Sequence, residues 1–290
     1  MDGFLFWQSF LSGISNASIY ALVALGLTLI LGVLDIADFA QGALYMLGAY
    51  GSFYALELFG VPFFLSLPLI VVLVGLVGVL NYAIVYRPIH RVGGSGTFIA
   101  ALGILFIVQN VALVVFGTTP HTLASPFGKD KFFFGAVILT YHKLFVMVAT
   151  LVIVLAVGLF LKKSKTGKAL RAMAQNRTAA SLVGIEVERV ALITFALAGA
   201  LAGVAGVLVS PIRPFDTYIG SFVIIKSFAI VIFGGLGSVS GALVGALIVG
   251  LAEAMTAVYV SSEYSDPVAF VLMILILFVR PQGLLGKAVT

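Results

Sequence analysis

VALITFALAGALAGVAGVLV, the segment from Val190 to Val209, carries no charged side chain and indicates the class of protein to which the chain belongs. About 20 apolar residues are enough to cross a membrane as one helix. The segment therefore predicts a membrane helix. Small residues recur along it at helical spacing, and such residues let helices approach closely in lipid; they are Ala198, Gly199, Ala202, Gly203, Ala205 and Gly206.

The composition of the whole chain extends this prediction. Hydrophobic residues make up 62% of the 290 residues and charged residues only 9%, whereas soluble domains carry about 25% charged residues. At about 20 residues per crossing, the apolar residues fill about nine spans. A soluble enzyme, a disordered protein and a secreted disulfide scaffold are excluded. Because the chain has no cysteine, disulfides and thiolate metal sites are excluded as well.

The apolar runs predict eight or nine crossings. Backbone groups find no water in hydrocarbon, and the runs are continuous rather than alternating, so they should be helices and not barrel strands. We predict an all-α, polytopic transmembrane helical bundle that forms a single domain over residues 1–290. The runs are Phe10–Val33, Phe39–Leu58, Phe63–Tyr86, Phe98–Phe116, Tyr141–Leu161, Val190–Val209, Phe222–Leu236, Ala242–Val260 and Val268–Val279.

Positive charge is concentrated between Lys162 and Arg189, where seven Lys and Arg residues stand against two Glu residues. The loop of about 162–189 thus carries +5, which equals the formal net charge of the chain. Positive loops stay in the cytoplasm, so we place it there with the other basic span ends, at Arg87, Arg91, Arg280 and Lys287. The C-terminus is then cytoplasmic and, with nine crossings, the N-terminus lies outside. The first nine residues lack Lys and Arg, so we expect the first run to be retained rather than cleaved.

Motifs for catalysis are missing from the sequence. No Gly-Lys pair belongs to a GxxxxGK[ST] phosphate loop, and neither HExxH nor GxSxG occurs. His90, His121 and His142 are dispersed without metal-ligand spacing. We expect no enzyme activity, no metal site, no cofactor and no nucleic-acid partner for this chain.

The basic loop contains TGKALRAMAQNRTAASLVGI, Thr166 to Ile185, which has helical character. Thr166 is suited to begin a helix and Gly184 to end it. Small residues approximate one face, while Lys168, Arg171 and Gln175 lie on another. Two interpretations stay open: a solvated topological anchor, or a helix that docks a cytoplasmic partner.

Polar residues interrupt the hydrophobic sequence LDIADFAQGALYMLGAY, Leu34 to Tyr50. A charge at the bilayer centre costs roughly 2.5 to 3.5 kcal/mol, so two nearby carboxylates indicate an interface or a water-filled path. In transporters, broken helices direct their N-termini at anionic substrate groups. The alternative is an ordinary short loop between two spans. The candidate path residues are Asp35, Asp38, Gln41, Gly42 and Tyr45.

Lys226 and Glu253 are ionisable residues within two successive apolar runs. If a tight turn near Ser238 joins these runs, the two residues lie roughly 18 and 22 Å from the turn, at 1.5 Å per residue. We therefore predict that they can pair. Intramembrane ionisable groups are functional candidates, and a structural ion pair or two interface residues are the alternatives.

Four motifs in this order resemble one known family. They are IADFAQGALYMLGAY, TGKALRAMAQNRTAASLVGI, FGGLGSVSGALVGA from Phe233, and VRPQGLLG from Val279. The chain resembles the LivH-type inner-membrane permease of branched-chain amino acid ABC importers over essentially its whole length. The resemblance implies a bacterial inner-membrane subunit that pairs with a second, LivM-like permease. It also implies two cytoplasmic ATPases, which bind ATP and Mg, and a periplasmic substrate-binding protein.

The resemblance further implies that the basic loop is the coupling region that contacts an ATPase. Arg171 precedes Ala172 where the related importer motif has Glu. The coupling residues implied in this way are Gly167, Lys168, Ala169, Leu170, Arg171, Ala172, Ala174, Asn176, Ala180 and Gly184.

The substrates implied by the resemblance are leucine, isoleucine and valine, while similar proteins carry urea, amides or other amino acids. The outer loop Gly117–Thr140, with Lys129, Asp130 and Lys131, either contacts the binding protein or is only solvated. One rival hypothesis is a self-sufficient secondary transporter, which would need Asp35, Asp38 or Glu253 for a coupling ion. Another rival is a membrane scaffold that transports nothing.

Overall fold

The computed structural model of the protein describes residues 2–90, 96–128, 131–134 and 137–286. Arg91, Lys129, Asp130 and Lys287, on which some sequence predictions rest, lie outside these residues, and the side chain of Lys131 is not described. The described chain is built almost entirely of helices. They are α1 (Asp2–Leu34), α2 (Ala40–Phe59), α3 (Phe63–Asn81), α4 (Arg87–His90), α5 (Gly96–Phe116), α6 (Tyr141–Lys163), α7 (Lys165–Gln175), α8 (Arg177–Leu182), α9 (Val187–Val209), α10 (Ile219–Gly234), α11 (Val239–Tyr259) and α12 (Val268–Val279).

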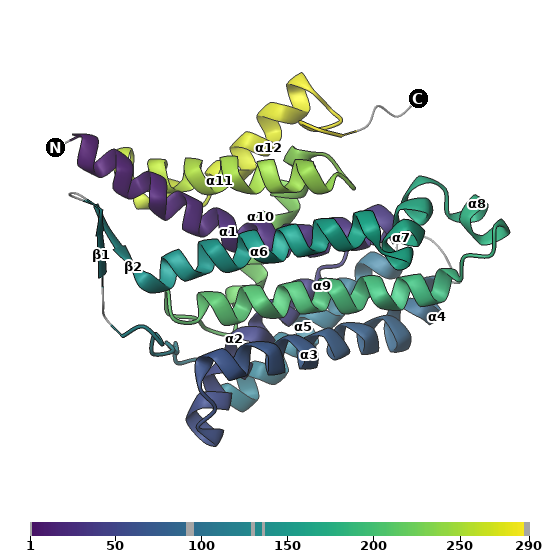
Figure 1. The fold of residues 1–290 in the computed structure, drawn as a ribbon, viewed down its shortest axis with the longest axis horizontal. Helices are drawn as coiled ribbons and strands as arrows, with labels where there is room; N and C mark the ends of the chain where they lie inside the picture. The colour runs from purple at the N-terminus through teal and green to yellow at the C-terminus, as the bar shows by residue number, and fades with distance from the viewer. Residues whose placement is uncertain (1, 91–95, 129–130, 135–136, 287–290) are drawn as a thin grey trace.

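The long helices α1, α3, α6, α9 and α11 run along the longest axis of the molecule (Figure 1). The start of α1 lies at one end with a hairpin of two antiparallel strands, β1 (Lys131–Phe134) and β2 (Val137–Thr140). Helices α4, α7 and α8 lie at the opposite end. We call these the hairpin end and the α7 end. The predicted all-α bundle is confirmed, although the hairpin stands where a loop was expected.

Helix α9, which contains Val190–Val209, lies at the centre of the bundle and packs against α1, α2 and α3. Its small residues permit this, since a Cβ on Gly199 would lie 2.9 Å from the backbone oxygen of Val74 in α3. A Cβ on Gly206 would lie 2.1 Å from the backbone oxygen of Tyr45 in α2. The close packing predicted from the alanine and glycine pattern is therefore confirmed.

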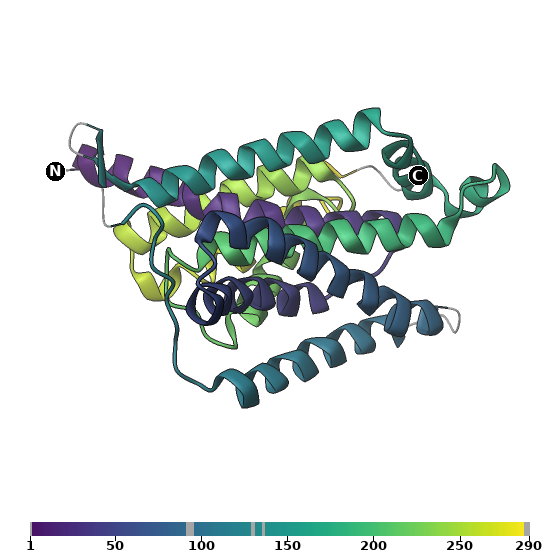
Figure 2. The same cartoon turned by 60° about the horizontal axis from the view of Figure 1, so that its bottom comes forward.

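The outward faces of several helices are apolar. Val114 in α5 is 86% exposed, and Figure 2 shows α5 at the edge of the bundle. Exposed aliphatic side chains also cover α3 and α6, among them Val72, Leu76, Leu80, Val148, Leu151 and Leu155. A soluble protein rarely exposes so large an apolar surface. The protein is therefore embedded in a membrane.

Six helical segments of the described chain are long and apolar enough to span a membrane. Helix α10 is shorter at 16 residues, and α12 has 12 residues. Helix α2 begins only after the connection Asp35–Phe39, in which Ile36 and Asp38 are buried. The predicted eight or nine crossings exceed these six segments and stay a prediction.

Candidate functional site

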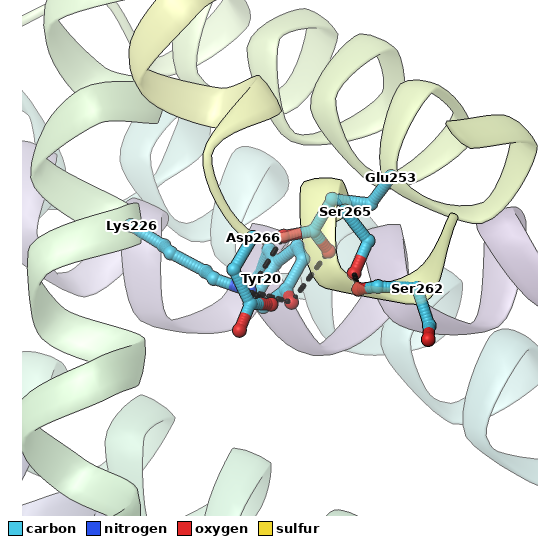
Figure 3. A network of polar contacts seen from close by, with 6 residues as sticks. All are labelled: Tyr20, Lys226, Glu253, Ser262, Ser265 and Asp266. Carbon is cyan, nitrogen blue, oxygen red and sulfur yellow. Dashed lines mark hydrogen bonds and ion pairs between the residues drawn. The ribbon is translucent and has the colours of Figure 1, made fainter. Parts of the chain in front are cut away.

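Four side chains from different parts of the chain meet at Lys226 (Figure 3). The ammonium of Lys226 donates hydrogen bonds to Oε1 of Glu253, at 2.6 Å, and to Oδ1 of Asp266, at 2.8 Å. The hydroxyl of Tyr20 donates to Oε2 of Glu253, at 2.7 Å, and lies 3.4 Å from the Lys226 ammonium. The predicted pairing of Lys226 with Glu253 is therefore confirmed, and we call these four residues the Lys226 cluster.

Four elements hold the Lys226 cluster together. Tyr20 comes from α1, Lys226 from α10 and Glu253 from α11, while Asp266 lies just before α12. Lys226 and Glu253 are buried, whereas the side chain of Asp266 is 72% exposed. A buried charge is tolerated when it is paired and hydrogen-bonded, and both buried charges meet this condition. The cluster thus joins the interior of the bundle to its surface.

Arg213, in the connection between α9 and α10, lies beside the Lys226 cluster. It lines one pocket together with Tyr20, Lys226 and Asp266. Sequence reasoning selected Lys226 and Glu253 but missed Arg213, Tyr20 and Asp266. The available signal was the rarity of charge, since Arg213 and Asp216 are the only charged residues between Ser210 and Gly220.

Asp38 and Gln41 lie together inside the bundle, at the start of α2. Oδ1 of Asp38 accepts hydrogen bonds from the backbone nitrogen of Ala40, at 3.0 Å, and from the hydroxyl of Tyr86. A wider, π-helical turn, η1 (Tyr82–Tyr86), carries this tyrosine, and such turns are frequent at functional sites. Nε2 of Gln41 donates to the backbone oxygen of Ala198 in α9, at 3.3 Å.

The N-terminal ends of α2 and α10 touch each other at two glycines. A Cβ on Gly42 would lie 2.6 Å from the backbone oxygen of Gly220, and one on Gly220 would lie 2.2 Å from that of Gly42. Helix N-termini carry partial positive charge. Two such ends therefore meet near Asp38, Gln41 and Tyr45, which is the arrangement that discontinuous transporter helices use at their substrate sites.

Asp35 is separated from the other path candidates. It is exposed and has the left-handed backbone angle φ of 57°. It lines a cavity of about 840 Å³ at the α7 end, where Arg171 and Gln175 of α7, Gly237, the start of α11 and Leu285 also line the wall. Asp35, a predicted path residue, and Arg171, a predicted coupling residue, thus line the same cavity.

The basic loop forms two helices, so the prediction of one helix from Thr166 to Ile185 was wrong in its details. Ser164, not Thr166, caps α7 by accepting a hydrogen bond from the Gly167 nitrogen at 2.8 Å. Asn176 is extended and caps α8 by accepting from the Ala179 nitrogen at 2.9 Å. Asn is preferred at such a cap and poor inside a helix, which explains the break. Gly184 follows α8 with φ of 86°, as expected for a residue that ends a helix.

The predicted coupling residues divide by burial. Gly167, Leu170 and Ala180 are buried against the protein itself, and Ala169 and Ala172 are half-buried. Lys168, Arg171, Ala174, Asn176 and Gly184 are exposed. Two apolar residues that sequence reasoning did not select, Leu182 and Val183, are 82% and 78% exposed at the end of α8. The loop therefore presents basic and apolar groups together at the α7 end.

Comparison with known proteins places this arrangement in a family. Residues 9–277 match the family described as the branched-chain amino acid transport system, permease component. The chain is 34% identical to the high-affinity branched-chain amino acid transport system permease protein LivH of Escherichia coli, over 97% of this chain and 96% of that protein. It is 31% identical to the corresponding permease protein BraD of Pseudomonas aeruginosa, over 97% and 95% of the two chains.

A second type of permease is also similar. The chain is 27% identical to the permease protein LivM of Escherichia coli, over 92% of this chain and 68% of that protein. No solved structure matches the chain significantly. The family match covers nearly the whole bundle, including the Lys226 cluster and the α7–α8 loop, so the resemblance read from the four motifs is confirmed. The chain belongs to the family of permease components of branched-chain amino acid transport systems.

Proposed function

We propose that the protein forms half of the translocation pathway of an ATP-driven importer for leucine, isoleucine and valine. The family match over residues 9–277 carries this proposal. The chain is then a single permease domain over residues 1–290, with a coupling loop at about 162–189. The other half of the pathway is a LivM-like permease, and a periplasmic binding protein delivers the substrate.

The topology that we propose has nine crossings, with α2, α10 and α12 added to the six longer segments. The α7 end lies in the cytoplasm of a bacterial cell and the hairpin end lies outside, because basic loops stay inside. Seven basic residues lie between Lys162 and Arg189. Backbone hydrogen bonds from Leu284 and Leu285 to Phe233 and Gly234 hold the segment after α12 beside the end of α10, so the C-terminal side is cytoplasmic in this topology.

Coupling to the ATPases, in this proposal, uses the exposed part of the α7–α8 loop. Ion pairs at a rim fix orientation and speed association, whereas buried apolar anchors hold partners together. Lys168 and Arg171 supply the charge, and Leu182 and Val183 supply exposed apolar area. Leu170 and Met173 of α7 are buried against the bundle. A movement of the ATPases that displaces the loop is therefore transmitted to the bundle through packed side chains.

The translocation path that we propose passes the N-terminal ends of α2 and α10 and the Lys226 cluster. Its residues are Asp38, Gln41, Gly42, Tyr45, Lys226 and Glu253, with Asp35 at the cytoplasmic mouth. No covalent chemistry is required of them. ATP binding and hydrolysis by the partner subunits shift the population between inward-open and outward-open states, because each state binds the partners differently.

Reconstitution of the five-protein system tests this function. We expect proteoliposomes that contain both permeases and both ATPases to take up labelled leucine only with ATP and the binding protein present. Unlabelled isoleucine and valine should compete, whereas urea and acetamide should not. Uptake by this chain alone without ATP would support a secondary transporter instead, and the absence of leucine uptake under every condition would refute the proposal.

Leu182→Glu is expected to weaken ATPase attachment strongly. The change places a carboxylate in the apolar contact that we propose, and burying it without a partner is costly. We expect at least a tenfold loss of ATPase co-purification and a parallel loss of uptake. Val260→Glu is the matched control, because Val260 is an aliphatic residue with 70% exposure that follows α11. Equal co-purification of the two variants would contradict a docking role for α8.

A further inference from the structure

A pocket opens beside the Lys226 cluster at the connection between α9 and α10. Its volume is about 330 Å³, which lies in the range of small-molecule sites. Arg213, Asp216, Lys226 and Asp266 line it, and so does the hydroxyl-bearing Tyr20. The rest of the lining is apolar and consists of Pro120, Pro214, Phe215, Ile219, Phe222 and Val223.

The pocket offers a ligand both unused hydrogen-bond donors with positive charge and an unused acceptor oxygen with negative charge. The ammonium of Lys226 already donates to Glu253 and Asp266, so Arg213 is the cation with donors to spare. A guanidinium has five N–H donors in a planar fork that fits a carboxylate. Asp266 uses Oδ1 for Lys226 and is 72% exposed, which leaves its other oxygen open to a cationic ligand.

The apolar lining and the start of α10 complete the pocket. Ile219, the first residue of α10, lines the wall, so the partial positive charge of the helix end adds to that of Arg213. Phe222 is 65% exposed, whereas Phe215 and Val223 beside it are buried. The lining can therefore cover an aliphatic side chain while the polar groups hold the charged end.

A backbone tether holds the wall of the pocket in place. His121 and Phe215 exchange two backbone hydrogen bonds of 2.9 Å, and the Leu123 nitrogen donates to the Ser210 oxygen at 3.1 Å. The chain after α5, which contributes Pro120, is thus fixed to the connection that contributes Arg213. Such a preformed site costs little ordering when a ligand binds.

We infer that this pocket is a binding subsite for a free, zwitterionic aliphatic amino acid. Arg213 and the α10 N-terminus hold the carboxylate, Asp266 holds the ammonium, and the side chain lies on Phe222 and Val223. The inference rests on the proposed function and deepens it, because it assigns to the permease a site of its own at the hairpin end. Tyr20, Lys226 and Asp266 of the Lys226 cluster line the pocket, so the pocket adjoins the proposed path, to which Lys226 belongs.

Direct binding to the assembled transporter, without the binding protein or nucleotide, tests the pocket. The probe is radiolabelled L-leucine, and the competitors are unlabelled leucine and leucinamide, which lacks the carboxylate. We expect leucinamide to compete at least tenfold more weakly than leucine. Arg213→Gln should weaken leucine binding about 10- to 100-fold, since it removes a charge-assisted hydrogen bond to the ligand's carboxylate. Arg213→Lys, which keeps the charge, should lose less.

The decisive readout is the coupling between Arg213 and the ligand's carboxylate. In Arg213→Gln the preference for leucine over leucinamide should largely disappear, which a loss of folding would not produce. Glu263→Gln is the control, because Glu263 is exposed close to Asp266 in sequence but does not line the pocket. An unchanged preference in Arg213→Gln, or no leucine binding by the wild-type complex, would overturn the inference. ATP-dependent uptake by the same wild-type complex would leave the proposed function standing in either case.

Discussion

Lys226→Met is expected to abolish uptake and to destabilise the permease by about 3 to 5 kcal/mol, the usual effect of removing one partner from a buried ion pair. Glu253 would lose its ion pair and keep the hydrogen bond from Tyr20, and Asp266 would lose its bond to Lys226. A loss of this size is a large fraction of the stability of a typical protein. The measurements are the thermal unfolding midpoint of the purified permease and leucine uptake by the reconstituted complex.

Exchanging the two charges tests whether the pair itself is what matters. Lys226→Glu combined with Glu253→Lys restores the pair but places a carboxylate against Asp266. We therefore expect partial rescue from the double exchange and fuller rescue when Asp266→Asn is added. Tyr20→Phe, which removes one hydrogen bond, should cost only about 1 to 3 kcal/mol. If neither combination is more stable to unfolding than the single variants, the ion pair does not explain why the protein carries Lys226 and Glu253.

Regular helix geometry made the Lys226–Glu253 pair predictable from sequence. Both residues lie in helices joined by a tight turn at Ser238, so a constant rise per residue matched their depths. Asp266 was not predictable in this way, because it lies in an irregular segment whose course depends on α11 and α12. Tyr20 was missed for another reason: apolar spans reveal little about which helix face meets which neighbour.

The basic loop shows the same division between local and long-range information. Its charge, its exposure and the role of Gly184 at its end followed from local sequence. The break at Asn176 was also local, since the Asn side chain caps α8, yet it was overlooked in a continuous alanine pattern. By contrast, the contact between Gly42 and Gly220 joins residues far apart in the chain. Only the packing of α2 and α10 in three dimensions reveals that contact.

Gly206→Ala is expected to cause a large loss of stability, because this glycine packs directly against the backbone of α2 at the centre of the bundle. The added Cβ would lie 2.1 Å from the Tyr45 oxygen, 2.8 Å from the Ala49 nitrogen and 3.0 Å from the Gly48 Cα. All three atoms belong to the backbone of α2, so no side chain can move aside. Overpacking a well-packed interior costs about 1 to 3 kcal/mol and occasionally more, and a backbone collision places Gly206→Ala at the upper end.

The matched control for this substitution is Gly158→Ala, in the middle of α6, where a Cβ would meet nothing within 4 Å. Alanine is favoured over glycine inside a helix by about 0.5 to 1 kcal/mol, so this variant should unfold at the same or a higher temperature. Gly206→Ala should unfold at a clearly lower temperature. It should also impair uptake beyond its effect on folding, because the forced contact lies at Tyr45, a residue of the proposed path. Equal unfolding midpoints would show that α2 and α9 can separate at little cost, which would contradict the close packing on which the proposed path depends.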